Sequence, residues 1–300
     1  MRERIALIGA TGIGKTALSL ELARSDARVA LFSCDSMAVY THMDLGTAKP
    51  TPGELGSLKY RLIDLVMPTE EFSVAAFQRH ALDAEAELGD EEVALYVGGS
   101  GLYHAVIFDA LVIPPSDLAV RAALEAELAA VGFVEMYARL AAQDLAAAAK
   151  IEANNSRRLI RALEVIEITQ RPFSSFGPGM TAYANRGELL FGLDTELAEL
   201  DLRIEARVHE LIEAGWVKEC EELAELGELS RSASYAIGYR ELFAYLDGEI
   251  TLEAAIVATI ARTRRLVRRQ RSWFSRDPRI IWFSEPAKLR DAIYEHLGTP

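Results

Sequence analysis

Short apolar runs alternate with helix-forming segments over the first hundred residues. The strand-like runs are Ile5–Ile8, Val29–Ser33 and Val93–Val97. Helix-like segments follow the first run and cover about residues 73–88. Continuous apolar runs of this length are typical of strands that are buried on both faces, and strands that alternate with helices build parallel sheets. The pattern therefore predicts an α/β fold in which a parallel sheet is flanked by helices.

The pattern changes at "IPPSD", residues 113–117. The chain is helix-like from about residue 116 to 170, and "RPFSSFGPGM" at 171–180 has the prolines and glycines of a loop. Strand-like runs return at 189–194 and 279–284, with long helical patterns at 196–215, 217–226 and 251–274. We therefore expect a core of residues 1–114 and 189–300, with an all-helical domain of residues 115–188 inserted into it.

A phosphate-binding motif stands directly after the first strand. Gly9, Gly14, Lys15 and Thr16 fit G-x-x-x-x-G-K-[ST], and residues 17–24 read as a helix. Strand, glycine loop and helix together direct backbone N–H groups at phosphate oxygens. Lys15 would neutralise phosphate charge, and the Thr16 hydroxyl would bind Mg²⁺. The predicted phosphate-binding positions are Gly9, Ala10, Thr11, Gly12, Ile13, Gly14, Lys15 and Thr16.

The acid that P-loop NTPases usually place at the end of another strand is missing. The run "VALYV" ends in Gly98, Gly99 and Ser100. An acid follows the second strand instead, because Asp35 stands just beyond Ser33. Ligands of open α/β sheets gather at this edge, so Asp35 is a candidate base or metal ligand. The alternative is an aspartate that only stabilises a turn or caps a helix.

Composition and charge narrow the class of protein. No apolar run approaches the roughly 18 residues of a membrane span, and the N-terminus leads straight into the first strand, so we expect neither a membrane anchor nor a signal peptide. Two cysteines suggest reduced thiols in the cytoplasm. The five histidines lack metal-ligand spacing and are interpreted as structural or surface residues.

Basic residues are concentrated although the net charge is −13. Residues 262–276, "RTRRLVRRQRSWFSR", hold seven arginines and no acid, and Arg157, Arg158 and Arg161 form a smaller cluster. The net charge argues against nucleic-acid binding, whereas the clusters could still dock a polyanion locally. A solvated basic face without a partner is the alternative for the larger cluster.

Several segments closely resemble the tRNA dimethylallyltransferase family, also called tRNA isopentenyltransferases. They are "GATGIGKT", "DSMAVYTHMDLGTAKP", "LIDLVMPTEEFSVAAF", "YVGGSGLY", "SRRLIRALEV", "RIEARVHELIEAGWVKE", "AIGYRELFAYLDGE" and "TRRLVRRQRSWF". The resemblance implies that the P-loop holds the diphosphate of dimethylallyl diphosphate as a leaving group. It further implies that the dimethylallyl group moves to N6 of the adenosine 3′ of the anticodon, position 37, with Mg²⁺ as cofactor. A cytoplasmic monomer that grips the tRNA anticodon stem-loop with the inserted domain is expected.

The resemblance also implies roles for individual residues. Asp35 would be the base, with Ser100 and Lys15 completing the catalytic set. A diphosphate-binding arginine is implied in "DLRIEARV", either Arg203 or Arg207, although both could simply pair with Asp201 or Glu205 on the surface. The implied tRNA contacts, with the cationic helix added from its charge, are Asp35, Ser36, Met37, Ala38, Ser100, Arg121, Arg157, Arg158, Leu159, Ile160, Arg161, Tyr235, Gly238, Tyr239, Arg240, Arg264, Arg265 and Arg268.

Two departures from the family pattern and three other functions remain open. Ser100 stands where most relatives carry Thr, and "EANN" at 152–155 replaces a commoner "HPND". A small-molecule P-loop kinase would share the P-loop and Asp35 but needs no arginine-rich helix. An adenylate isopentenyltransferase would lack the inserted domain. An RNA-binding protein without activity would not need Lys15, Thr16 and Asp35 together.

Overall fold

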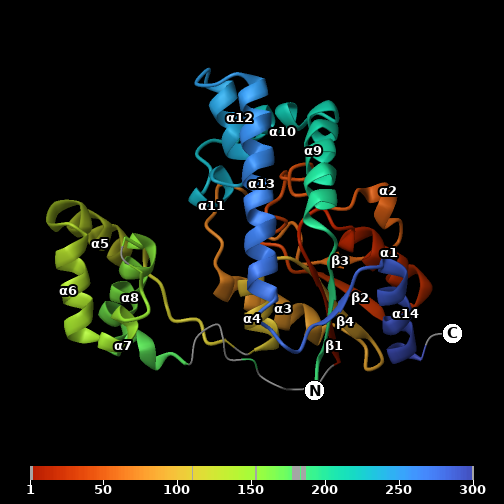
Figure 1. Ribbon diagram of the computed structural model, residues 1–300, viewed down its shortest axis with the longest axis horizontal. Helices are drawn as coiled ribbons and strands as arrows, with labels where there is room; N and C mark the ends of the chain where they lie inside the picture. The colour runs from red at the N-terminus through yellow and green to blue at the C-terminus, as the bar shows by residue number, and fades with distance from the viewer. Residues whose placement is uncertain (1–2, 110, 153, 178–182, 184–186, 299–300) are drawn as a thin grey trace. The chain divides into compact units, whose positions relative to one another are not determined.

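Six parallel strands form one sheet in the order β3-β2-β4-β1-β5-β6 in a computed structural model of the chain (Figure 1). The structure describes residues 3–109, 111–152, 154–177, 183 and 187–298. The strands are β1 (Arg4–Gly9), β2 (Val29–Ser33), β3 (Tyr60–Arg61), β4 (Val93–Gly98), β5 (Leu189–Leu193) and β6 (Ile281–Phe283). The predicted α/β class with a parallel sheet is confirmed, and the two-residue β3 is too short for a sequence pattern to indicate it.

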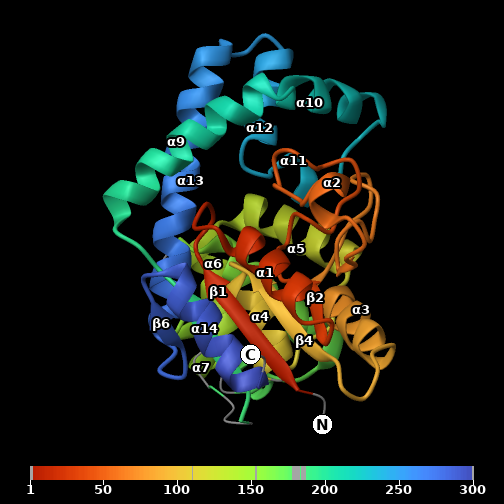
Figure 2. The same ribbon diagram turned by 90° about the vertical axis from the view of Figure 1, so that its right-hand side faces the viewer.

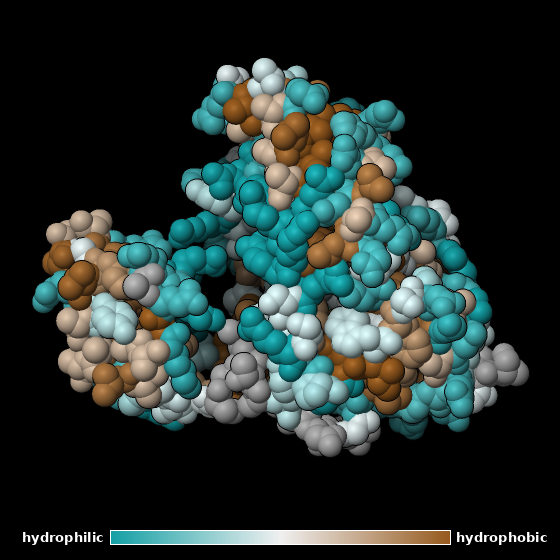
Figure 3. All heavy atoms as spheres, in the orientation of Figure 1, coloured by the Kyte–Doolittle hydropathy of each residue, from teal (hydrophilic) through white to brown (hydrophobic). Residues whose placement is uncertain are grey.

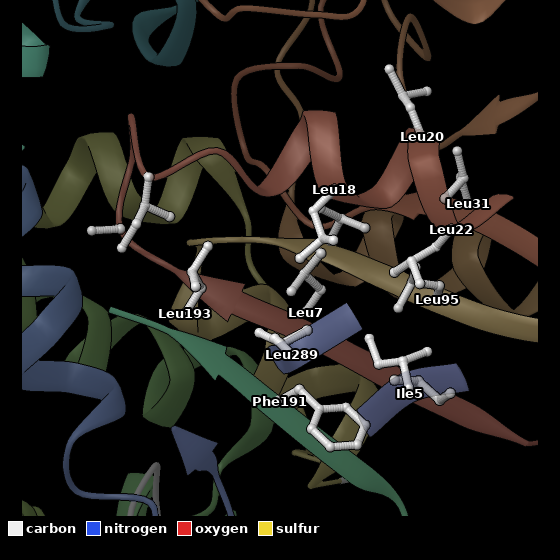
Figure 4. Packing of buried hydrophobic residues seen from close by; sticks show 14 of the residues in the cluster. Ile5, Leu7, Leu18, Leu20, Leu22, Leu31, Leu95, Phe191, Leu193 and Leu289 are labelled. Atoms are coloured by element: carbon white, nitrogen blue, oxygen red, sulfur yellow. The ribbon is translucent and has the colours of Figure 1, made fainter. Parts of the chain in front are cut away.

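Alternate residues of the strands build the main hydrophobic core on one face of the sheet. Ile5 and Leu7 of β1 lie there with Leu95 of β4, whose register places Leu95 opposite Ile5. Two helices cover this face, α1 (Lys15–Ser25) and α14 (Pro286–Leu297), and Figure 4 shows Leu18 and Leu289 among the strand side chains. Full burial of such side chains contributes roughly 1.5–3 kcal/mol each to folding.

The opposite face of the sheet carries buried aromatic residues. Phe32 of β2 packs on Tyr96 of β4, with ring centroids 4.9 Å apart. The Tyr96 hydroxyl donates a 2.6 Å hydrogen bond to Glu85, and Arg4 forms an ion pair of 2.7 Å with the same carboxylate. Glu85 belongs to α3 (Val74–Ala86), which therefore covers this face together with α4 (Gly101–Phe108).

The C-terminal part of the core contributes a set of helices beyond the carboxyl edge of the sheet. They are α9 (Leu197–Glu213), α10 (Trp216–Glu225), α11 (Arg231–Ser234), α12 (Tyr239–Leu246) and α13 (Leu252–Phe274), and the short α2 (Pro52–Leu55) lies in the loop after β2. Helices α9 and α13 are neighbours in both views (Figures 1 and 2). The sequence pattern separated α9, α10 and α13 but did not single out α2, α11, α12 or α14.

The chain divides into two compact units, residues 1–107 with 185–300, and residues 108–184. The second unit overlaps the predicted insertion of residues 115–188 and is helical. Its elements are α5 (Leu118–Val131), α6 (Phe133–Gln143), α7 (Leu145–Ala148), α8 (Ser156–Thr169) and a 3₁₀ turn, η1 (Phe173–Ser175). A separate core joins Leu124 of α5, Met136 and Leu140 of α6, and Leu163 of α8. Of the loop predicted at 171–180, residues 178–180 lie outside the described residues.

Candidate active site

The phosphate-binding motif forms the turn between β1 and α1. Gly14 caps α1 with φ of +100°, a left-handed conformation that favours glycine. The Lys15 ammonium donates a 2.8 Å hydrogen bond to the Ala10 carbonyl, which folds the lysine back over the loop. Burial lowers the pKa of Lys15 to about 8; Asp35 raises it and Arg207 lowers it further. A buried cation at a helix N-terminus is suited to binding an anion.

One predicted phosphate donor is already engaged within the protein. The Thr11 N–H donates a 3.0 Å hydrogen bond to Gln270 Oε1. This N–H is therefore engaged within the protein in this conformation, and the predicted role of Thr11 in phosphate binding would fall to its other groups. The Ile13 side chain is buried in the main core, so only its backbone can serve a ligand. The cradle thus consists of the backbone from Gly12 to Thr16 together with the Lys15 side chain.

The loops that follow β2 and β4 are bonded to each other. Ser100 N–H donates to the Cys34 carbonyl at 3.3 Å, and Ser36 N–H donates to Ser100 Oγ at 3.1 Å. A Cβ on Gly98 would lie 2.1 Å from the Cys34 carbonyl oxygen, so only glycine permits this approach. The close neighbour of Gly98 is thus another loop of the same chain.

Asp35 stands where these two loops meet. Its Oδ1 accepts a 2.8 Å hydrogen bond from Met37 N–H, as in a turn that an aspartate stabilises. The same carboxylate acts on the pKa of both Lys15 and Arg207, which it raises. Asp35 therefore has the turn contact expected of a structural aspartate and, in addition, acts electrostatically on two half-buried cations. The Ala38 side chain is buried, so only its backbone is open to an RNA contact.

Arg203 and Arg207 of α9 have different surroundings although they lie one turn apart. Arg203 forms a 2.5 Å ion pair with Glu199, four residues earlier, and its side chain is about half exposed. Arg207 is half-buried; burial lowers its pKa, whereas Asp35 and Glu210 raise it. Arg207 also lowers the pKa of Lys15. Arg207 is thus the arginine of this helix that shares a site with Lys15 and Asp35.

A half-buried carboxylate missed by the sequence interpretation holds the loop after β2. Glu219 of α10 accepts hydrogen bonds from the N–H groups of Asp44, Leu45 and Gly46, at 3.1, 2.8 and 3.4 Å. The Tyr239 hydroxyl donates to the same carboxylate at 2.6 Å. The Tyr239 side chain is therefore buried and structural, so the predicted tRNA contact at this position would have to come from its backbone.

Lys49 fixes the same loop from within. Its side chain is 4% exposed, and its ammonium lies 2.6 Å from Asp44, from Asp64 and from the Tyr40 carbonyl. The lysine of "GTAKP" is therefore a structural clamp on the segment that begins at Asp35. The quoted "GTAKP" and "GWVKE" segments contained both Lys49 and Glu219, but neither pattern indicates that they hold the same loop.

The arginine-rich helix divides into paired and unpaired cations. Arg264 pairs with Glu205 at 2.7 Å, and Arg268 pairs with Asp201 at 2.8 Å. Arg265 and Arg269 are exposed, and no acid of the described chain pairs with either. The acids Asp201 and Glu205 thus pair with α13 rather than with Arg203 or Arg207. Figure 3 shows hydrophilic side chains along the middle of α13.

A further exposed pair follows α11. Tyr235 is 59% exposed, and the Arg240 guanidinium lies 5.1 Å from the centre of its ring. Such a pair offers an aromatic face and a charge at one place on the surface. Gly238, between them, packs tightly against Trp216 of α10, where a Cβ would lie 2.0 Å from the indole. Of the positions predicted here, Tyr235 and Arg240 are open to a partner.

The predicted tRNA positions of the second unit fall into three groups. Arg157 and Arg158 are exposed at the start of α8, without an ion pair in the part of the chain that is described. Arg121 and Arg161 both bond Glu164, whose side chain is fully buried. Leu159 and Ile160 are buried in the core of the unit. Their side chains stabilise the unit, so the RNA contacts predicted for these two positions would have to come from their backbone.

The predicted Mg²⁺ ligand is the hydroxyl of Thr16. The Thr16 side chain stands at the first turn of α1 and is half-buried, without a hydrogen bond among the described residues. A free hydroxyl beside a phosphate cradle suits Mg²⁺, which takes few protein ligands and completes its shell with water and phosphate. The described residues contain no group of three or more His, Cys, Asp or Glu side chains arranged for a metal.

No helix in the described ranges has the length and apolar character needed to cross a bilayer.

Comparisons with known proteins agree on one family. The family described as IPP transferase matches residues 38–277. The tRNA dimethylallyltransferase of Nocardioides sp. is 43% identical over 293 residues, which are 96% of this chain and 94% of that one. The tRNA isopentenylpyrophosphate transferase of Bacillus halodurans is 34% identical with a TM-score of 0.71, covering 99% of this chain and 97% of that one.

A eukaryotic dimethylallyltransferase acting on tRNA supports the fold alone. Its structure is 21% identical with a TM-score of 0.81, covering 100% of this chain and 81% of that one. The family match and the curated relative each span most of the sequence. The chain therefore belongs to the tRNA dimethylallyltransferase family.

Proposed function

We propose that this chain transfers the dimethylallyl group of dimethylallyl diphosphate to N6 of adenosine 37 of tRNA, releasing diphosphate. The observation that carries the proposal is the phosphate-binding turn with Lys15 folded over it, beside the loop of Asp35, where Asp35 and Arg207 both act on the Lys15 charge. Two cations suit a diphosphate, and a carboxylate facing them suits a base for the incoming amine. The family membership supports the same reaction.

Departure of the diphosphate requires positive charge where negative charge builds up. The bond between the first carbon of the dimethylallyl group and the diphosphate oxygen breaks, and its electron pair stays on the diphosphate. Lys15, Arg207 and the N–H groups at the start of α1 stabilise that charge. Thr16 would hold Mg²⁺, which when bound neutralises further phosphate charge. No phosphoryl group is transferred, so an acid that prepares a water molecule is not required.

The adenine amine needs a base because its lone pair is delocalised into the ring. As N6 bonds to the dimethylallyl carbon, one N6 proton passes to the Asp35 carboxylate. Ser36 N–H already holds Ser100 Oγ, so the hydroxyl that replaces the usual threonine remains beside Asp35. The target adenine leaves its stack between neighbouring nucleotides to reach this site, at a cost of a few kcal/mol.

The reaction can be tested with one labelled donor. The protein is incubated with Mg²⁺, bulk tRNA and dimethylallyl diphosphate labelled in the five-carbon group, and the digested nucleosides are analysed by mass. Labelled N6-modified adenosine is the expected product. Label on free AMP instead of tRNA would point to a nucleotide isopentenyltransferase, and phosphate released from ATP without any label transfer would point to a kinase.

Arg207→Gln should lower kcat/KM for dimethylallyl diphosphate by about 100-fold, because hydrogen bonds to charged groups contribute roughly 1.5–3 kcal/mol. Arg203→Gln is the matched control, since it removes the same charge one turn earlier on the same helix, where the arginine pairs with Glu199. The control should stay within about threefold of the wild type. The measurement is steady-state transfer at saturating tRNA. Equal losses in the two variants would contradict the assignment of Arg207.

Replacing Arg265 and Arg269 together with Gln should weaken tRNA binding and flatten its salt dependence. Each lost phosphate contact lowers the slope of log affinity against log salt by roughly 0.7–0.9. Filter binding between low and moderate salt measures the slope. The matched control is Arg264→Gln with Arg268→Gln, which removes two arginines paired with α9 and should change the slope less. If the Arg265 and Arg269 variant keeps the wild-type slope, these arginines do not contact phosphate.

A further inference from the structure

We infer that Gln270 is a positioning residue that fixes the P-loop against the loop after β4. The inference rests on the proposed transfer reaction. Gln270 lies on α13 and is buried, on the same helical stripe as Val267 and Phe274. Apart from Thr259, the other buried residues of α13 are apolar, and a buried amide requires hydrogen-bond partners.

Both ends of the Gln270 amide are used, and each joins a different loop. Its oxygen accepts from Thr11 N–H at 3.0 Å, and its nitrogen donates to the Gly99 carbonyl at 3.0 Å. A glutamine amide supplies a donor and an acceptor on one rigid plane, so the two loops are held at one spacing. A Cβ on Gly99 would lie 2.4 Å from Gln270 Nε2, so glycine is needed for this contact.

The two loops joined by Gln270 carry the two halves of the proposed chemistry. Thr11 begins the turn that leads to Lys15, and Gly99 precedes Ser100, whose hydroxyl holds the N–H of Ser36 next to Asp35. The bridge therefore runs from the diphosphate cradle to the loop of the base. Attack by N6 on the dimethylallyl carbon depends on the alignment of these two parts, and small misalignments lower the rate strongly.

Helix α13 is a rigid support for this amide. Arg271 forms a 2.6 Å ion pair with Asp194, just beyond β5, and Phe274 packs edge-on against His104 of α4 at 5.4 Å. Both contacts lie within the helical turn that follows Gln270. The amide is thus held by the helix rather than by the loops that it joins, as a positioning residue requires.

Two variants of Gln270 distinguish the alignment of the two loops from the charge beside the phosphate cradle. They are Gln270→Met and Gln270→Glu. Methionine keeps the volume and loses both hydrogen bonds, so kcat should fall about 30-fold while KM for dimethylallyl diphosphate and for tRNA changes less than threefold. Glutamate keeps the acceptor for Thr11 but places a negative charge beside the cradle, so KM for dimethylallyl diphosphate should rise more than tenfold. Ile293→Ala, in the core of α14, is the control for lost stability and should keep the kcat of the folded protein.

Amide exchange of the P-loop tests the bridge without reference to activity. The Thr11 N–H should exchange at least tenfold faster in Gln270→Met than in the wild type and in Ile293→Ala. Unchanged exchange, or a kcat loss in Gln270→Met that follows its folded fraction as in the control, would overturn the inference. Absence of label transfer by the wild type would instead overturn the proposed function, and the exchange result would still decide whether the bridge exists.

Discussion

Asp35→Asn should lower the rate of dimethylallyl transfer by about 10³-fold, since a positioned general base contributes roughly 10²–10⁴-fold. Asparagine keeps an oxygen for the Met37 N–H, so the turn that Asp35 stabilises should persist. It cannot take the N6 proton, and it no longer faces Lys15 and Arg207 as an anion. Single-turnover transfer at saturating donor and tRNA measures the loss directly.

The binding of tRNA distinguishes a lost base from a lost binding contact. Asp35→Asn should bind tRNA within about twofold of the wild type in filter binding. Asp44→Asn is a useful control, because Asp44 belongs to the same loop and touches Lys49 rather than the cradle. The Asp44→Asn variant should keep a transfer rate within about tenfold of that of the wild type. Transfer by Asp35→Asn within threefold of the wild type would remove Asp35 from the role of base.

Glu164→Ala should destabilise the second unit by about 3 kcal/mol, because removing one partner of a buried ion pair typically costs roughly 3–5 kcal/mol and the two arginines are partly exposed. Glu164 has a fully buried side chain that accepts from Arg121 at 2.9 Å and from Arg161 at 2.8 Å. It also accepts from Asp117 N–H at 2.9 Å, at the start of α5. Denaturant unfolding, followed by limited proteolysis within residues 108–184, measures the effect.

The pH dependence of the same carboxylate provides a second measurement. Burial alone would raise the pKa of Glu164, but the hydrogen bonds from Arg161 and Arg121 hold it below its usual value. Its contribution to stability is therefore complete above the ordinary glutamate pKa and is lost as pH falls through the lowered value. Glu164→Gln should lose this acid dependence. Glu167→Ala, one turn away in an exposed pair with Arg139, should change stability by less than about 0.5 kcal/mol.

Elements with a strong local signal could be predicted from the sequence, and the partners of side chains could not. The apolar runs of β1, β2 and β4 are buried on both faces, so their sequence pattern is continuous and clear. The phosphate turn has a fixed spacing that depends on its own backbone. By contrast, Arg203 and Arg207 are one turn apart on one helix, and only the fold decides which of them faces Asp35.

The charge pattern along the sequence does not indicate ion pairs between distant segments. Arg264 and Arg268 stand in a run without acids, yet their acids come from α9, more than fifty residues earlier in the chain. The sequence pattern does not indicate the role of Gln270 in the same run. Its neighbours in sequence are arginines, whereas its neighbours in space are Thr11 and Gly99. Leu159 and Ile160 were carried over with a motif whose apolar members serve the core.

The internal pairing of arginines on α13 bears on how this chain would distinguish one RNA from another. Affinity for arbitrary RNA comes mainly from phosphate electrostatics. With a net charge of −13 and with Arg264 and Arg268 neutralised by α9, the protein offers few cations to a random polyanion. Complexes with incorrect RNAs should therefore be short-lived. An RNA would stay bound for long only if its shape let its phosphates contact several of the unpaired arginines at once. The net negative charge should thereby speed the search for the correct substrate by shortening unproductive encounters.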